Sequence, residues 1–288
     1  MNTTQQTNNT KTILVVLAHP DDETFGTGGT LALYAQQGVK VHLVCATRGE
    51  VGEMDPKYMQ GFSSVGERRE AELRCAAGKL GLSGVYFLGY RDSGMPGSPD
   101  NQHPNALAAQ PFQEVAARVA MYIRKLKPQV VITFDPIGGY RHPDHIAIHN
   151  ATVSGFSLAA SGDFRDEENL PPFQAERLFF HTMPHTFLRV AVFMLRLAGK
   201  DPRRFGTNGD IDLVSIAEVR FPTHARINYR KVAHIREEAA VCHASQGGGS
   251  TGGFRGWLSK ILSSSDTYMQ AYPQPKTGRL IQDLFDGL

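Results

Sequence analysis

Short apolar segments alternate with helical segments along the first 160 residues of the chain. Each apolar segment is short, is rich in β-branched residues and ends close to a turn, which favours a buried strand. Strands that alternate with helices form right-handed crossovers and a parallel sheet. The pattern therefore predicts an α/β fold with a Rossmann-like, mainly parallel sheet and helices on both of its faces. The predicted strands are Thr12–Ala18, Lys40–Ala46, Val85–Leu88 and Gln129–Phe134.

The segments between these strands carry apolar residues at helical spacing and have recognisable ends. Gly38 and Gly81 stand just past two of the helices, where a left-handed residue commonly ends a helix. Pro143 suits the first turn of the last helix, because that position needs no backbone N–H. The predicted helices are Gly28–Gln37, Gly66–Leu80, Pro111–Lys127 and Pro143–Ala160.

The pattern is less regular beyond residue 160, and we expect a C-terminal extension that shapes the substrate site. Strands are predicted at Glu176–His181 and Asp212–Phe221, and a helix at Tyr229–Ala244. Residues 247–256 are rich in glycine, which predicts a flexible surface loop or, alternatively, a lid. We expect a disordered polar tail over 1–10 and a single catalytic domain over 11–288, with its core in 11–160 and the extension in 161–288.

Composition limits the classes of partner. Hydrophobic residues make up 41% of the chain and charged residues 20%, as in ordinary soluble globular proteins. The formal net charge is only +2, so bulk electrostatics do not favour a nucleic-acid partner. The most apolar later stretch, Thr186–Ala198, contains two arginines and is too short to span a bilayer. It favours a helix that covers the core or contacts another copy in a homo-oligomer, with attachment to a membrane surface as the alternative.

The three cysteines are widely separated and form no CxxC pair. They are Cys45, Cys75 and Cys242. A sparse, odd-numbered set favours reduced thiols over a disulfide framework. The first ten residues have neither the basic nor the apolar region of a secretory signal. We therefore predict reduced cysteines and a cytoplasmic location.

Two clusters of histidine and aspartate stand directly after two of the predicted strands. HPDD (His19–Asp22) follows the first strand, and HPDH (His142–His145) follows the fourth. If the strands take the common order 3-2-1-4, these two strands are neighbours, and ligands gather at their carboxyl ends. The two clusters then meet in space although they are far apart in the sequence. We predict that they form one site.

The residue types in these clusters suit a hydrolytic zinc site, which takes three protein ligands and leaves a fourth position for water. His19 and one of the two aspartates, Asp21 or Asp22, supply two ligands. One of the histidines of the second cluster, His142 or His145, supplies the third. The remaining aspartate can act as a general base toward water, whose pKa the metal lowers to about 7. The residues alone leave both choices open.

The position of the second cluster at the start of a helix adds chemistry. The positive end of that helix points into the site and favours a bound anion or a developing oxyanion. Asp144 is close enough to orient a histidine and to fix its tautomer.

The segments AHPDDETFGTGGTLA (Ala18–Ala32) and GGYRHPDH (Gly138–His145) closely resemble the zinc-dependent de-N-acetylase family. That family includes N-acetylglucosaminyl-phosphatidylinositol deacetylases and the deacetylases of mycothiol and bacillithiol synthesis. The resemblance covers the N-terminal half well and the C-terminal half in patches. Shorter matches are RREAELRCAAGKLG (Arg68–Gly81), LGYRDSGM (Leu88–Met95) and CHASQ (Cys242–Gln246).

The resemblance implies a role for each matching residue. His19, Asp22 and His145 become the ligands of a zinc ion, with iron(II) as the alternative metal. Asp21 becomes the general base.

The same resemblance assigns residues around the metal. His142 becomes the acid or oxyanion-stabilising histidine, supported by Asp144. Tyr140 matches a tyrosine that hydrogen-bonds the tetrahedral intermediate in some members. Arg69, in an R-x-x-E pattern with a glutamate, and Asp92 match positions that hold the sugar.

The function implied is hydrolysis of an N-acetyl group from an N-acetylglucosamine-type derivative by metal-activated water. Alternatives are a metal-dependent amidase or phosphoesterase that acts on another small substrate, and a non-catalytic sugar-binding protein. A phosphoesterase commonly needs more carboxylates, because it holds two metal ions. A binding protein has no need for a complete ligand set and a base.

Overall fold

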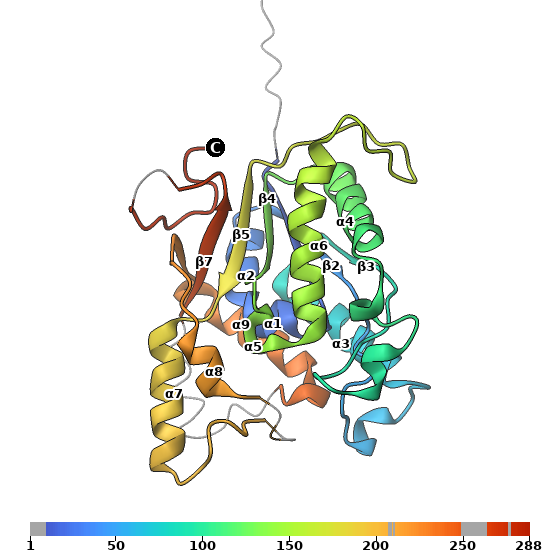
Figure 1. Cartoon of the computed structure of the whole chain (residues 1–288). Helices are drawn as coiled ribbons and strands as arrows, with labels where there is room; N and C mark the ends of the chain where they lie inside the picture. Colours follow the sequence, from blue (N-terminus) through green and yellow to red (C-terminus); the bar gives the residue numbers. More distant parts are fainter. Residues whose placement is uncertain (1–9, 207–208, 210, 249–263, 276–277) are drawn as a thin grey trace, which may run out of the picture.

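A seven-stranded sheet lies at the centre of the computed structural model, which describes residues 10–206, 209, 211–248, 264–275 and 278–288 (Figure 1). Its strand order is β3-β2-β1-β4-β5-β7-β6. The first five strands of the chain are parallel, and β7 and β6 extend the sheet in the antiparallel sense. The strands are β1 (Thr12–Leu17), β2 (Lys40–Cys45), β3 (Gly84–Phe87), β4 (Val130–Phe134), β5 (Arg177–Thr182), β6 (Ala225–Asn228) and β7 (Ser265–Tyr272).

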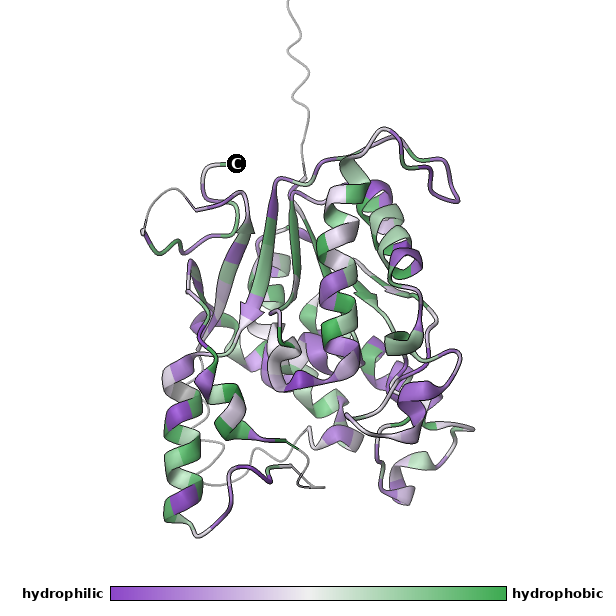
Figure 2. Cartoon of the chain, viewed as in Figure 1, coloured by the Kyte–Doolittle hydropathy of each residue, from purple (hydrophilic) through white to green (hydrophobic). Residues whose placement is uncertain are grey.

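Helices cover both faces of this sheet, as the sequence predicts. Helices α4 (Phe112–Leu126) and α6 (Pro143–Ala160) pack together on one face (Figure 1). The other face carries α2 (Gly28–Gln36), α3 (Val65–Leu80) and α9 (Ala233–Cys242). Apolar residues concentrate in the strands between these layers (Figure 2). The α/β fold class is confirmed.

The order of β2, β1 and β4 decides where the two His/Asp clusters lie. Every residue of β1 and β4 is buried, as expected for central strands of a parallel sheet. Strand β1 pairs with β2 on one side and with β4 on the other. The predicted order 3-2-1-4 is therefore confirmed, and the loops that follow β1 and β4 are neighbours.

The prediction of a strand at Asp212–Phe221 is wrong. Most of this segment forms helix α8 (Leu213–Glu218). The Asp212 carboxylate accepts hydrogen bonds from the backbone N–H groups of Val214 and Ser215, at 2.9 and 3.0 Å, and so caps the helix. Leu213 and Ile216, one turn apart, are buried in a cluster with residues of α7 (His185–Leu197). The cap and this tertiary contact outweigh the strand-like composition.

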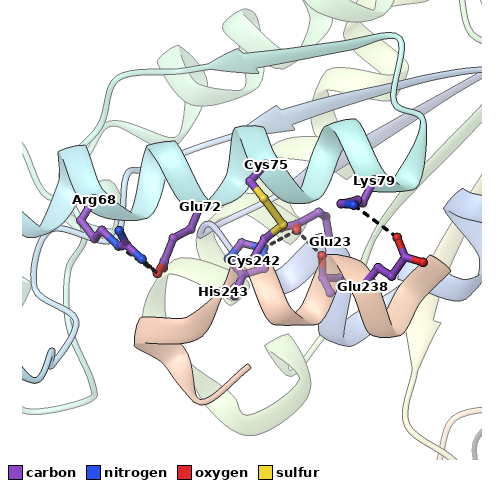
Figure 3. Close-up of a disulfide and its surroundings, with 9 residues drawn as sticks. Glu23, Arg68, Glu72, Cys75, Lys79, Glu238, Cys242 and His243 are labelled. Atoms are coloured by element: carbon purple, nitrogen blue, oxygen red, sulfur yellow. Dashed lines mark hydrogen bonds and ion pairs between the residues drawn. A yellow bond between two sulfur atoms is a disulfide. The ribbon is translucent and has the colours of Figure 1, made fainter. Parts of the chain in front are cut away.

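Two cysteines predicted to be reduced form a disulfide. Cys75 on α3 and Cys242 at the end of α9 are joined, although 167 positions separate them, and only Cys45 is free (Figure 3). No local pattern indicates this pair, because only the packing of α3 against α9 brings the two residues together. Disulfides are rare in the cytosol, so the cysteine argument for a cytoplasmic location no longer holds.

Replacing Cys75 by Ser should lower the free energy of unfolding by about 2–4 kcal/mol, because the disulfide closes a very long loop of the unfolded chain. Denaturant unfolding of the purified protein measures this change. A matched variant, Cys242→Ser, and the wild-type protein in reductant should show the same loss, since each removes one and the same bond. Unfolding that is insensitive to all three changes would contradict a stabilising role for the disulfide.

Three further predictions concern membrane spanning, the N-terminal tail and the glycine-rich segment. Among the described residues, no helix is both long enough and apolar enough to cross a bilayer. The predicted tail lies outside the described residues, apart from Thr10. Most of the glycine-rich segment 247–256 also lies outside them, because the structure describes only its first two residues.

Candidate metal centre

The loops after β1 and β4 bring the two clusters into contact, as predicted. His19 Nδ1 lies 3.2 Å from His145 Nε2. Asp22 Oδ2 is 3.6 Å from His19 Nδ1, and the other oxygen of the same carboxylate, Oδ1, is 3.4 Å from His145 Nε2. Donors bonded to one tetrahedral zinc at roughly 2.0–2.2 Å lie about 3.3–3.6 Å apart. The spacing of these three donors therefore fits a single small cation.

The outer nitrogen of each histidine already has a protein acceptor. His19 Nε2 lies 3.1 Å from a carboxylate oxygen of Asp144, and His145 Nδ1 lies 3.2 Å from the Gly138 carbonyl oxygen. When these outer nitrogens donate, the inner nitrogens present lone pairs to each other and to the Asp22 carboxylate. Outer hydrogen bonds of this kind orient the ligands of a metal.

The Asp144 carboxylate has more than one hydrogen-bond partner. It accepts hydrogen bonds from the backbone N–H of Ser93, at 2.9 Å, and from the Ser93 hydroxyl, in addition to its contact with His19. The family resemblance implies that Asp144 supports His142. The structure instead places the carboxylate against His19, and only the backbone N–H of Asp144 contacts His142.

Asp92, like Asp144, lies next to Nε2 of His19. Its Oδ1 atom is 3.5 Å from His19 Nε2 and accepts a hydrogen bond of 2.8 Å from the Gly94 N–H. Asp92 therefore forms a turn and also contributes negative charge beside a histidine of the cluster. Donor atoms of His19, Asp92 and Asp144 lie within 4.8 Å of one another, as do those of His19, His142 and His145.

His142 ends the loop and caps α6, as its position before Pro143 predicts. Its Nδ1 accepts a hydrogen bond of 3.2 Å from the Asp144 N–H, which leaves Nε2 as the protonated nitrogen of the neutral ring. Burial lowers the pKa of His142 to about 2, and the nearby imidazoles of His19 and His145 act in the same direction. His142 is therefore a neutral hydrogen-bond donor.

A tight turn of two glycines precedes His142. Gly138 and Gly139 both have φ 64°. A Cβ atom on Gly138 would lie 2.7 Å from the Cβ of His145, so the turn requires glycine at this point. The turn positions Tyr140, whose ring centroid lies 4.9 Å from that of His145 and 5.9 Å from that of His142. Burial raises the pKa of the Tyr140 phenol well above its usual range, so its O–H remains a donor.

Asp21 has an unusual backbone conformation, with φ 118°. Its side chain lies 3.1 Å from a guanidinium nitrogen of Arg69, and the same nitrogen donates to the Pro20 carbonyl at 2.8 Å. Burial raises the pKa of Asp21 to about 6, while the charge of Arg69 acts against this rise. A pKa in this range suits a group that exchanges a proton near neutral pH.

Arg69 is buried and is not a solvated charge on the surface of α3. It is 5% exposed, and its guanidinium also donates to the Gly49 carbonyl oxygen at 3.1 Å. Glu72, the other residue of the R-x-x-E pattern, instead contacts Arg68 (Figure 3). Its carboxylate also accepts hydrogen bonds from Ser245. Arg69 thus contacts the loop of the first cluster directly.

Glu23 and His243, for which the sequence predicts no role, support the backbone of Asp21. One oxygen of the buried Glu23 carboxylate accepts a hydrogen bond of 2.9 Å from the Asp21 N–H. The other oxygen lies 2.7 Å from His243 Nε2, at the end of α9 (Figure 3). Both residues stand in the segments that carry the family resemblance, which was the available signal.

Comparisons with known proteins agree with this interpretation of the two clusters. The model of the family described as PIG-L, GlcNAc-PI de-N-acetylase, matches residues 14–156, which contain both clusters. A 1D-myo-inositol 2-acetamido-2-deoxy-alpha-D-glucopyranoside deacetylase of Actinosynnema mirum is 34% identical over 289 residues, and the alignment covers 96% of each protein. The chain belongs to the PIG-L family. The resemblance predicted from the sequence is confirmed.

A further relative and a solved structure are also similar to this chain. A deacetylase of the same name from Kineococcus radiotolerans is 42% identical over 204 residues, which cover 66% of this chain and 56% of that protein. The N,N′-diacetylchitobiose deacetylase from Pyrococcus horikoshii has the same fold, with a TM-score of 0.63 and 19% identity. The match covers 93% of this chain and 88% of that one.

Proposed function

We propose that this member of the PIG-L family is a metal-dependent deacetylase, which hydrolyses the N-acetyl group of an N-acetylglucosamine-type derivative. The cluster of His19, Asp22 and His145 donors, with the Asp21 carboxylate close enough to interact with the charges of Asp22 and His19, carries this proposal, because hydrolysis of an amide needs both a base and an electrophile. The relative from Actinosynnema mirum, which aligns over nearly its whole length, is named as such a deacetylase. We further propose that residues 11–288 act as one catalytic domain, since β7 and His243 support the core from the C-terminal part.

His19, Asp22 and His145 are the proposed metal ligands. The alternative groups of donors use Asp92 and Asp144, or His142. Both oxygens of Asp144 accept hydrogen bonds from Ser93, Asp92 Oδ1 accepts one from Gly94, and His142 Nδ1 accepts a backbone N–H, whereas Asp22 accepts the His19 N–H through Oδ2 and presents Oδ1 to His145. Two histidines and one carboxylate suit zinc, and iron(II) accepts the same set. The bound metal would polarise the acetamide carbonyl and lower the pKa of a water molecule to about 7.

Asp21 carries out both proton transfers, from the attacking water and to the leaving amine. Its carboxylate accepts the proton of the attacking water, and the nearby Arg69 guanidinium holds the carboxylate in place. His142 is neutral, with its pKa lowered, so it is a poor acid. Asp21 therefore returns the proton to the leaving amine. This assigns both the base and the acid roles to one residue.

Two donors stabilise the negative charge that develops on the acetamide oxygen. His142 donates from Nε2 and Tyr140 from its hydroxyl, and neither group carries a positive charge that would compete for the ligands. The N-terminus of α6, which begins at Pro143, adds its positive end to the same region. Contacts to the sugar by Arg69 and Asp92 stay predictions, since their present partners are Asp21 and His19.

The purified protein loaded with zinc should release acetate from an inositol glycoside of N-acetylglucosamine faster than from free N-acetylglucosamine. Binding energy from the added group can be used at the reacting carbonyl, so kcat/KM should rise with its size. Acetate release across aglycone variants measures this, with phosphate esters assayed in parallel. Turnover of phosphate esters alone would refute the deacetylase. Tight sugar binding without turnover in the metal-loaded protein would identify a binding protein instead.

A further inference from the structure

Helix α7 (His185–Leu197) buries one apolar face and exposes another. Its inner face includes Leu188 and Val192, which are buried against α8 in a small cluster separate from the main core of the sheet. Its outer face carries four large apolar side chains at positions i, i+3, i+4 and i+7, which we call the outer stripe. They are Val190, Phe193, Met194 and Leu197, with exposed fractions of 52%, 58%, 56% and 67%. An exposed apolar stripe of this size marks an interaction surface.

A basic groove runs beside the outer stripe, between α7 and α8 (Leu213–Glu218). It has a volume of about 520 Å³, and Phe193 of the stripe forms part of its wall. Its lining includes the guanidinium groups of Arg189, Arg196 and Arg220 and one carboxylate, that of Glu218. Within the described part of the chain, none of the three guanidinium groups makes an ion pair. The groove therefore presents unneutralised positive charge next to an apolar surface.

We propose that the outer stripe and the basic groove dock on a membrane surface that contains anionic phospholipids. Arginine guanidinium groups bind phosphate with paired hydrogen bonds, so Arg189, Arg196 and Arg220 suit the headgroups. A helix with basic residues on one side and Phe, Leu, Met and Val on another is typical of helices that lie in the membrane interface. Helix α7 contains no acidic residue. Lys200 and Arg204 follow it as further basic residues, whereas Arg203 is paired with Asp212 at 3.4 Å.

A second copy of the chain fits this surface less well. In a two-fold contact the same patch meets itself. Antiparallel packing of two outer stripes places Arg189 and Arg196 of one copy near Arg196 and Arg189 of the other, because both arginines lie on the same side of the helix. Like charges at such short range oppose association, whereas a phosphate-rich surface attracts them.

Docking through α7 would also orient the metal centre. Helix α7 lies at the end of the molecule that carries α5 (Gly138–Arg141) and α1 (Asp22–Gly26), beyond the carboxyl ends of the parallel strands (Figure 1). Helix α8 links the two regions, since Arg141 donates to the Ser215 hydroxyl at 3.3 Å. The docked protein would hold this end close to the bilayer. The inference does not depend on the proposed reaction.

Co-sedimentation of the full chain with vesicles tests the proposal. The protein should bind vesicles of phosphatidylcholine mixed with phosphatidylglycerol, and bind vesicles of phosphatidylcholine alone at least about 10-fold more weakly. Added salt should weaken the binding to anionic vesicles, because the attraction is screened. The double variant Arg189→Glu and Arg196→Glu should reduce partitioning by about 30-fold or more. The double variant Phe193→Ser and Met194→Ser should reduce it by about 10-fold.

A matched control replaces similar residues elsewhere. Phe112 on α4 is exposed, as is Arg165 in the loop after α6. The variant Phe112→Ser with Arg165→Glu should bind anionic vesicles like the wild type. Equal binding to both kinds of vesicle, or no binding to either, would overturn the proposal. Lipid-free self-association seen by light scattering and lost in the Phe193→Ser, Met194→Ser variant would also overturn it, in favour of a second copy.

Discussion

Replacing Asp21 by Asn should lower turnover by about 10²–10⁴-fold while the protein keeps its metal. The amide retains the size of the carboxylate and can still lie beside Arg69, but it cannot accept the proton of the attacking water. The proposed ligands His19, Asp22 and His145 are untouched by the change. Acetate release measures the loss of turnover, and metal analysis of the same purified sample measures the retention of metal.

The neighbouring aspartate provides the matched control for this prediction. Asp22→Asn changes the same functional group one residue away, but it removes a charge that lies 3.4 Å from His145 Nε2 and 3.6 Å from His19 Nδ1. We therefore expect it to lose metal as well as activity. If Asp21→Asn loses the metal and Asp22→Asn keeps it, the proposed division between base and ligand is reversed.

Replacing His142 by Ala should lower kcat by about 10²–10³-fold, the usual effect of removing one donor to an oxyanion. KM should change little, because the hydrogen bond forms as the charge develops. Since burial holds the pKa of His142 near 2, the ring is neutral throughout the assay range. The ratio of wild-type to variant rates should therefore be constant from weakly acid to weakly alkaline pH.

Two outcomes would contradict this role for His142. An unchanged kcat in the alanine variant would remove His142 from the mechanism. A rate ratio that changes with pH would show that the ring loses or gains a proton in the reaction. The variant His142→Gln, whose amide can still donate a hydrogen bond, should retain more activity than His142→Ala.

The sequence was sufficient to predict the core of the fold and the location of the site. Strands β1 and β4 are continuous apolar runs that are buried along their whole length in a parallel sheet, where local composition decides the structure. The two clusters stand at the carboxyl ends of neighbouring strands, so one assumption about strand order was enough to bring His19 and His145 together.

The features that the sequence did not predict depend on contacts between distant segments. Strands β6 and β7 contain many polar residues, and they become strands because β7 pairs with the edge of β5. The Cys75–Cys242 bond and the Glu23–His243 contact both require α9 to pack against the N-terminal half. No local pattern in a single sequence records such packing, so neither could be predicted.

The Glu23–His243 contact makes completion of the site depend on a segment that is synthesised long after the first four strands. Strands β1 to β4 can pair once about half of the chain has left the ribosome, since a domain commonly folds from its N-terminal elements onward. The carboxylate that holds the Asp21 backbone gains its histidine only when residue 243 arrives, 220 positions after Glu23. A nascent chain could therefore acquire its sheet and its donor histidines well before it holds Asp21 firmly, and activity would appear late in synthesis. A hybrid that joins this N-terminal half to the C-terminal half of a relative would need a residue at position 243 that can bond Glu23.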